Sequence, residues 1–345
     1  QNYLNYKTDE VLLGAEENRL KLELLRIPLL WRIARDFDLV HFNSGQTLMP
    51  QRVLRTERYQ SKWLALYQRY VQLVELLDLP LLQRMGKGIA VTFQGDDARQ
   101  GDYCRAHFPI TAVSEVEEGY YAPATDVHKR HRITKIAQYA DRIYALNPDL
   151  LHVLPPQTQF MAYANVDPRE WQPVINSASD LPVVLHAPSH RGVKGTRFIL
   201  EAVRQLEAEG VPFKFVLVEG LANAEAKKLY QQADLLIDQL LIGWYGGLAV
   251  ELMALGKPVI CYLRESDLHF IPNAMRADLP LINAEPGNIY AVLKEWLTTR
   301  RHALPELGRY SRSYVERWHD PRQIAGYLKA EYMQIMQEKG REKQR

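Results

Sequence analysis

A basic turn follows an apolar run in the middle of the chain. Val183–His186 is apolar, and Arg191 and Lys194 come next, at the turn and first positions of a predicted helix. Two side chains three residues apart can face the same anion. Arginine offers a planar fork of donors and lysine a point charge. This pattern predicts a site for a phosphate group.

A glycine-rich turn follows a second apolar run, Leu235–Asp238. Gly246, Gly247 and Leu248 open another predicted helix, where the first backbone N–H groups lack partners inside the helix. Glycine lets a ligand come close, and the helix dipole favours an anion. Two such turns in one α/β sheet predict a diphosphate held between cationic side chains and a helix N-terminus, which points to an enzyme that uses nucleotide sugars.

These segments resemble the retaining family 4 of the GT-B glycosyltransferases, many of them bacterial. The resemblance rests on residues 190–196, on Tyr230–Asp234, on Gly246–Pro258, and more loosely on Phe93–Arg99 and Tyr139–Leu151. It implies an α/β protein of the GT-B type, with two Rossmann-like domains whose parallel sheets face each other across a cleft.

The resemblance also implies roles for individual residues. Arg191 and Lys194 would be catalytic, by stabilising the diphosphate as it leaves with growing negative charge. Glu251 would accept hydrogen bonds from the ribose hydroxyls. The expected donor-binding set is Ser189, His190, Tyr245, Gly246, Gly247, Leu248 and Glu251.

One position departs from the family pattern. Many relatives carry a second glutamate, which contacts the donor sugar, eight positions before the ribose glutamate, and here that position is Gly243. Asp238, Gln239 or Tyr245 are the alternatives for this contact, and the sequence does not choose between them.

Polar residues after an N-terminal strand form the expected acceptor side. This set is Gln94, Asp96, Asp97, Arg99 and, from another strand, His41. Gln94 stands where many relatives have histidine, and an amide cannot relay protons. Asp96 and Asp97 fit two readings, as hydroxyl binders or as turn formers. Their spacing is not the Asp-x-Asp of metal-dependent transferases, and no histidine cluster has metal-ligand spacing, so we expect no metal. We also expect no cofactor other than the nucleotide sugar itself.

Short apolar strands alternate with helices along the whole chain, which predicts parallel sheets of Rossmann type. The expected strands are Asp38–Phe42, Gly88–Phe93, Arg142–Leu146, Phe160–Tyr163, Val183–His186, Phe213–Val218, Leu235–Asp238, Pro258–Leu263 and Pro280–Asn283.

The expected domains are an acceptor-side domain over residues 1–165, a linker over 166–181 and a donor domain over 182–318. A C-terminal helix over 319–345 is expected to pack back toward the first domain. The resemblance would place one more strand, a glycine-rich loop and a helix before Gln1.

Composition narrows the class of protein. The 345 residues carry a formal net charge of +2, and no basic stripe with interleaved aromatics indicates a nucleic-acid partner. Cys104 and Cys261 lie far apart in the sequence, which favours a reducing compartment over a disulfide framework. No apolar run is long enough to span a membrane, so we expect a cytoplasmic protein.

One apolar helix leaves an alternative open. Trp63, Tyr67, Tyr70, Val74 and Leu77 form a stripe at helical spacing, and such a stripe is usually core. The alternative is peripheral contact with a membrane, which would suit a lipid-linked acceptor. A second segment, Leu29–Arg32, is a weaker candidate for the same contact.

The expected function is transfer of a sugar, with retention, from a nucleotide-diphosphate sugar to a saccharide or lipid-linked acceptor in polysaccharide synthesis. The alternatives are a nucleotide-sugar epimerase and a non-catalytic protein that binds nucleotide sugars or glycans. A dinucleotide dehydrogenase fits worst, because no Gly-x-Gly-x-x-Gly follows a first strand.

Overall fold

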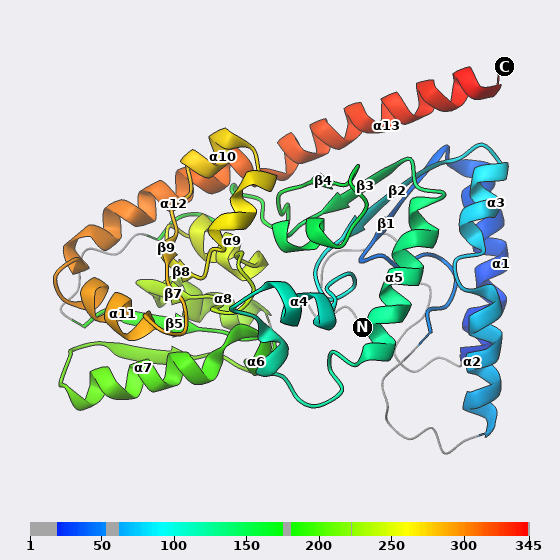
Figure 1. The fold of residues 1–345 in the computed structure, drawn as a ribbon. Helices are drawn as coiled ribbons and strands as arrows, with labels where there is room; N and C mark the ends of the chain where they lie inside the picture. Colours follow the sequence, from blue (N-terminus) through cyan, green and yellow to red (C-terminus); the bar gives the residue numbers. More distant parts are fainter. Residues whose placement is uncertain (1–18, 53–61, 175–180, 222, 344–345) are drawn as a thin grey trace. The chain divides into compact units, whose positions relative to one another are not determined.

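The structure is a computed structural model that describes residues 19–52, 62–174, 181–221 and 223–343 (Figure 1). The chain forms two compact units. The first unit comprises residues 1–103, 118–161 and 327–345, and the second comprises residues 104–117 and 162–326.

The first unit contains a parallel four-stranded sheet in the order β1-β2-β3-β4. Its strands are β1 (Leu39–Asn43), β2 (Gly88–Phe93), β3 (Arg142–Ala145) and β4 (Gln159–Phe160). Its helices are α1 (Arg19–Asp36), α2 (Lys62–Val74), α3 (Asp78–Arg84), the start of α4 (Gly101–His107), α5 (Pro123–Ala137), a 3-10 turn at Pro148–His152 and most of α13 (Pro321–Lys343).

The second unit contains a parallel five-stranded sheet in the order β6-β5-β7-β8-β9. Its strands are β5 (Val183–His186), β6 (Lys214–Leu217), β7 (Leu235–Ile237), β8 (Val259–Cys261) and β9 (Ile282–Asn283). Its helices are α6 (Arg191–Lys194), α7 (Thr196–Ala208), α8 (Asn223–Gln232), α9 (Gly247–Ala254), α10 (Asn273–Ala277), α11 (Ile289–Leu297) and α12 (Leu304–Trp318), with 3-10 turns at Ala112–Ser114, Glu265–Phe270 and Arg301–Ala303. Every expected strand overlaps an observed one: β2 and β5 have the expected ends, the ends of the others are shifted, and β4 shares only Phe160 with the strand expected there.

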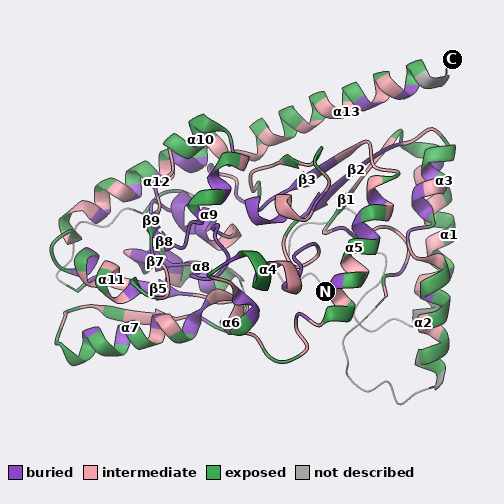
Figure 2. Ribbon diagram, in the orientation of Figure 1, coloured by how far each residue is buried: buried purple, intermediate pink, exposed green. Residues whose placement is uncertain are grey.

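The strands pair in parallel, and helices or 3-10 turns connect successive strands of each sheet. All of β2 and all of β7 are buried, as their nearly continuous apolar sequences require. On α7 the buried side chains Ile199, Val203 and Leu206 recur at helical spacing and join the core of the second unit. Figure 2 shows this contrast between buried strands and half-exposed helices.

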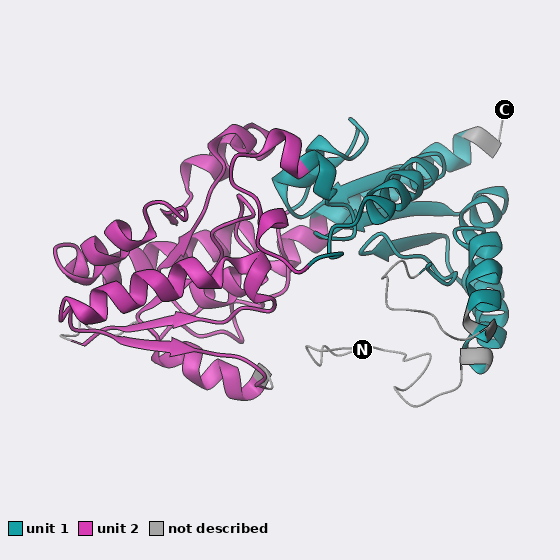
Figure 3. Ribbon diagram, turned by 60° about the horizontal axis from the view of Figure 1, so that its bottom comes forward, with its two compact units in different colours: residues 1–103, 118–161, 327–345 teal, residues 104–117, 162–326 magenta. Residues whose placement is uncertain are grey.

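The C-terminal helix α13 returns to the first unit from Tyr327 onward (Figure 3). Arg142 on β3 donates to Glu331 at 2.9 Å, and Ile335 is fully buried. A Cβ atom at Gly88 would lie 2.8 Å from Ile335, so a larger residue there would force the Ile335 side chain to shift.

Residues 104–117 belong with the second unit (Figure 3), although they lie inside the range expected for the first domain. Arg197 on α7 donates to Glu115 at 2.7 Å. The backbone of Glu115 also lies against Gly192, where a side chain would meet its carbonyl oxygen at 2.2 Å. Contacts between residues distant in sequence set this boundary, and strand patterns do not reveal them.

The first part of the expected linker is bound to the second unit. Arg312 on α12 donates to the carbonyl of Pro168 at 2.6 Å, and Val174 N–H donates to Leu255 at the end of α9 at 2.9 Å. Residues 175–180 of that linker lie outside the described residues.

The expectation that the α2 stripe is core is wrong for most of its members. Trp63 is 80% exposed, and Tyr70 and Leu77 are also exposed. Among the residues of α2 whose burial the structure describes, Val71 is the fully buried one, one position away from Tyr70. The apolar side of α2 is broad, and its sequence does not tell which part of that side turns inward. No described helix is long and apolar enough to cross a membrane.

Candidate functional site in the second unit

The two turns predicted to bind phosphate lie at the switch point of the second sheet. Strand β5 pairs with β6 on one side and with β7 on the other. The chain therefore runs from β5 outward to β6 and then returns past β5 to β7 on its other side. Ligands of open α/β sheets bind beyond the carboxyl ends of the strands at this point. Lys194 follows β5 through α6, and Asp238 directly follows β7.

Lys194 meets the glycine-rich turn through Asp238. Its ammonium donates to Asp238 Oδ1 at 2.9 Å and to Gln239 Oε1 at 2.8 Å. The other oxygen of Asp238 accepts the backbone N–H of Gly246 at 2.7 Å. A Cβ atom at Gly246 would lie 3.2 Å from Lys194 Nζ. The predicted cation and the start of α9 therefore converge on one place.

The first turn of α9 leaves backbone donors available. Gly246 is the N-cap residue, and within the described part of the chain neither Gly247 N–H nor Leu248 N–H has an acceptor. These amides are the donors that an anion at a helix N-terminus accepts from.

Glu251 lies one turn further along α9 and is 7% exposed. Burial raises the pKa of its carboxyl to about 7, against the side-chain amide of Asn165, which lowers it. The same amide donates to the carbonyl of Gly247 at 3.2 Å. A carboxylate with few donors around it suits hydroxyl groups as partners.

Arg191 and Lys194 turn to opposite sides of β5. Arg191 pairs with Glu219, which follows β6, through Nε at 2.8 Å, and its side chain is 58% exposed. His190 is the N-cap residue of α6, and its ring accepts from Val193 N–H at 3.3 Å. Ser189, just before it, is exposed. Of the two predicted cations, only Lys194 contacts the glycine-rich turn.

Tyr245 lies in the interior of the unit. Its side chain is fully buried, and its hydroxyl bonds Tyr314 at 2.8 Å and His319 at 2.9 Å. Burial lowers the pKa of His319 to about 4, so the ring is neutral. Tyr245 thus anchors the glycine-rich turn to α12.

Gly243 has a positive φ of 91°, which favours glycine. A side chain there would also lie 2.8–2.9 Å from Arg264. The guanidinium of Arg264 donates to Asp267 at 2.8 Å and stacks on Phe108 at 3.6 Å. A buried Arg–Asp pair therefore lies beside the position where the family pattern has glutamate.

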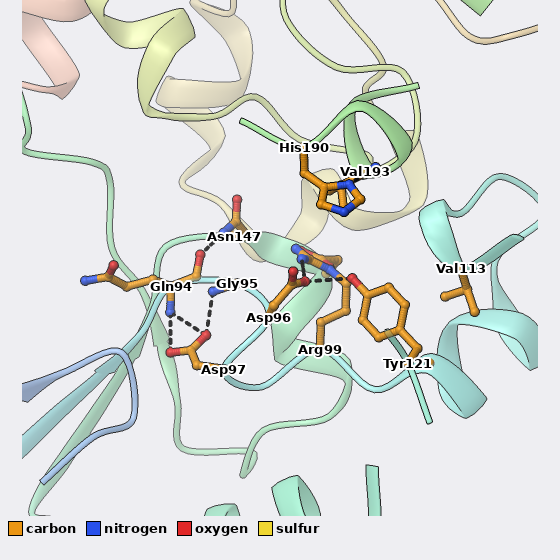
Figure 4. A network of polar contacts seen from close by, with 12 residues as sticks. Gln94, Gly95, Asp96, Asp97, Arg99, Val113, Tyr121, Asn147, His190 and Val193 are labelled. Atoms are coloured by element: carbon orange, nitrogen blue, oxygen red, sulfur yellow. Dashed lines mark hydrogen bonds and ion pairs between the residues drawn. The ribbon is translucent and has the colours of Figure 1, made fainter. Parts of the chain in front are cut away.

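Three of the predicted acceptor residues, Asp96, Asp97 and Arg99, are hydrogen-bonded to other groups of the first unit (Figure 4). Asp97 accepts from Gln94 N–H at 2.9 Å and from Gly95 N–H at 2.6 Å, which is the behaviour of a turn former. The Gln94 side chain is exposed and points away from Asp96 and Arg99.

Asp96 and Arg99 satisfy each other and their neighbours. Asp96 accepts from Arg99 at 2.7 Å and from the hydroxyls of Tyr120 and Tyr121. Burial acts to raise the pKa of Asp96, but Arg99 and the two hydroxyls lower it to about 2. Arg99 also donates to Asp149 at 2.7 Å.

His41 is engaged on both ring nitrogens. It bonds Tyr332 on α13 through Nδ1 and Thr92 on β2 through Nε2 at 2.7 Å. Burial lowers its pKa to about 4, so it links the sheet to α13 as a neutral ring. In the described residues no group of three or more His, Cys, Asp or Glu side chains has the arrangement of a metal site.

Three residues around the start of α9 make contacts that were not predicted from the sequence. Asp238 and Gln239 were weighed only as sugar contacts, yet they hold Lys194. Asn165, the last residue of the expected first domain, had no predicted role, yet its side-chain amide donates to the carbonyl of Gly247. The position of Asp238 directly after a buried strand was the available signal, whereas nothing local marks Asn165.

No protein-family model matches this sequence, and no curated protein matches it. Solved structures do match the fold. Sucrose-phosphate synthase from Thermosynechococcus elongatus gives a TM-score of 0.55 at 15% identity, over 94% of this chain and 80% of that one. Anabaena HepE in complex with UDP-glucose gives 0.52 at 12% identity, over 89% and 82%. A Rickettsia africae glycosyltransferase gives 0.53 at 12% identity, over 94% and 84%. The chain has the GT-B fold of these glycosyltransferases, with two Rossmann-like parallel sheets.

Proposed function

We propose that this protein transfers a sugar from a nucleotide-diphosphate sugar to a saccharide or lipid-linked acceptor, with retention of the anomeric configuration. The observation that carries the proposal is the meeting of the Lys194 ammonium with the N-terminus of α9 at the switch point of the second sheet. The GT-B fold, shared with HepE bound to UDP-glucose, agrees with it.

The leaving diphosphate is stabilised by fixed positive charge in this proposal. Its oxygens accept from Lys194 and from the amides of Gly247 and Leu248, and donors placed beforehand cost no reorganisation as charge develops. Glu251 holds the ribose. Arg191 releases Glu219 and binds the diphosphate, because exposed ion pairs are weak. These groups supply the charge that a metal supplies in other transferases.

Calorimetry with UDP-, GDP- and ADP-linked sugars tests the proposal, followed by product analysis by NMR in the presence of saccharide acceptors. Binding of one donor, with a new glycosidic bond of unchanged anomeric configuration, is the expected result. Inversion at C2 or C4 of the donor would instead indicate an epimerase, and binding without turnover a binding protein. Absence of binding to every donor would overturn the proposal.

Peripheral contact with a membrane is the second part of the proposal, and the exposed face of α1 and α2 supports it. On α2 the exposed apolar residues recur at spacings of three and four: Trp63, Leu66, Tyr70 and Leu73. Leu77, four positions further on, is also exposed and is the N-cap residue of α3. On α1 the corresponding residues are Leu24, Ile27 and Trp31. Tyr67 and Tyr70 both donate to Glu23, which joins the two helices.

Arg69 on α2 and Arg35 on α1 are also exposed, and Arg35 pairs with Asp36. Exposed apolar side chains with basic residues on the same helices suit a lipid surface with anionic headgroups. Co-sedimentation with anionic vesicles should fall for the double variant Trp63→Ser, Leu73→Ser. The matched control is Val127→Ser, an exposed apolar residue on α5. Equal sedimentation of the two proteins, or a dimer dissolved by the double variant, would argue against the membrane.

A further inference from the structure

An internal carboxylate already holds two of the donors at the proposed diphosphate site. Asp238 bridges the Lys194 ammonium and the Gly246 N–H at 2.9 and 2.7 Å. Its side chain is fully buried, and that of Lys194 is 12% exposed. The carboxylate therefore balances the charge of Lys194 and lies beside any anion that binds at the start of α9.

One N–H group of the Lys194 ammonium has no acceptor among the described residues. An ammonium has three N–H groups, and two of them point to Asp238 and Gln239. No third acceptor for Lys194 is found in the described ranges. The Gln239 amide in turn donates to the carbonyl of Trp244, so both acceptors are themselves fixed to the glycine-rich turn or its strand.

We propose that Asp238 is a positioning residue that sets the strength of the diphosphate site, and this inference rests on the proposed function. It acts in two opposite ways. By fixing Lys194 it aims the third N–H before the donor arrives, which favours turnover. By its own negative charge it weakens the binding of a nucleoside diphosphate, because like charges repel strongly in a site of low dielectric constant.

The two effects predict opposite changes in one variant. Asp238→Asn removes the charge and leaves a single carbonyl oxygen for two donors. The Kd of the nucleoside diphosphate should fall about tenfold or more, since the repulsion is gone and a donor is released to the ligand. The kcat should fall about tenfold or more, since Lys194 is no longer held in place. A purely structural role would weaken binding and turnover together.

The experiment measures the Kd of UDP, GDP and ADP by calorimetry, choosing the one that the wild-type protein binds best, and then kcat with the matching donor. Asp278→Asn is the control for charge, because Asp278 pairs with Arg317 and Trp318 instead, and it should change neither value. Gln239→Glu adds a charge at the other acceptor of Lys194 and should weaken diphosphate binding.

Unchanged or weaker binding by folded Asp238→Asn would overturn the inference while leaving the proposed function in place. If that variant does not fold, unchanged or tighter binding by Gln239→Glu overturns it in the same way. Absence of nucleotide binding by the wild-type protein would overturn the inference and the proposed function together.

Discussion

The carboxyl edges of the two sheets carry similar polar residues but differ in whether their hydrogen-bonding groups have partners within the protein. In the first unit, Arg99 donates to both Asp96 and Asp149, and Asp96 also accepts from two tyrosine hydroxyls. In the second unit, Gly247 and Leu248 keep amides without an acceptor in the described residues. The first edge is a closed network and the second an open one.

The difference separates stability from binding. A buried charge that loses its partner is costly to the fold, so a closed network stabilises its own loop. An open set of donors stabilises nothing until a ligand arrives, and its groups are those from which a bound anion gains. Arginine and aspartate occur at both edges, so residue type alone does not distinguish the two roles.

The strongest way to break this comparison is to open the closed network. Arg99→Met leaves Asp149 and Asp96 without their guanidinium, and we expect a loss of about 3–5 kcal/mol in the free energy of unfolding, measured by urea denaturation. Arg130→Met is the matched control, because Arg130 and Asp102 form a pair that is about half exposed, and it should lose no more than about 1 kcal/mol. An equally small loss for Arg99→Met would contradict a stabilising network.

The next largest effect is expected at Lys194. Lys194→Met should lower kcat by about a hundredfold to a thousandfold, as loss of a donor to a developing charge does. The single variant also leaves Asp238 buried and unpaired, so the double variant Lys194→Met, Asp238→Asn serves as control. It should recover stability but not activity. Recovery of both would show that Lys194 serves the fold alone.

The fold was largely predictable from the sequence. The strands are nearly continuous apolar runs such as Gly88–Phe93, a pattern that needs no knowledge of distant contacts. The turns after β5 and β7 were predictable for the same reason, since glycines and basic residues directly after a strand are a local signal.

Partners of charged groups were not predictable. Nothing in the sequence tells whether Arg191 pairs with Glu219 or with a ligand, or that Asp238 captures Lys194. The acceptor expectation for Asp96 and Arg99 meets the same limit, because Tyr120 and Tyr121 are far along the chain. The inward face of α2 was ambiguous for another reason: its apolar side is broad, and only part of that side is buried.

A third test removes the N–H of Gly247 and leaves the hydrogen bonds within α9 unchanged. Gly247 is the first helical residue of α9, where proline is tolerated because the N–H has no helical acceptor. Gly247→Pro removes this N–H and Gly247→Ala keeps it. Both place a Cβ 3.2 Å from the Asn165 amide. We expect donor affinity about tenfold to a hundredfold lower for the proline variant, the value of a charge-assisted hydrogen bond. Equal donor affinities for the proline and alanine variants would show that the Gly247 N–H does not bind the ligand.

The smallest expected effect concerns Glu251, whose pKa burial raises to about 7. The ionised carboxylate accepts two hydroxyl hydrogen bonds and the neutral acid fewer. Donor affinity should therefore rise about tenfold between about pH 6 and pH 8. Calorimetry with a nucleotide sugar measures this, because its diphosphate is esterified at both ends and does not titrate in that range. Glu251→Gln should show no such rise.

Stability should respond to pH in the opposite direction. Because the pKa of Glu251 is raised in the folded protein, its contribution to stability is complete below the unfolded value and is lost as pH rises through about 7. The free energy of unfolding of wild type should thus decline toward pH 8 relative to Glu251→Gln. The site then gains affinity where the fold loses stability, which is the behaviour expected of a group at the open edge. If the free energy of unfolding depended on pH in the same way for wild type and Glu251→Gln, Glu251 would resemble the hydrogen-bonded carboxylates of the first unit instead.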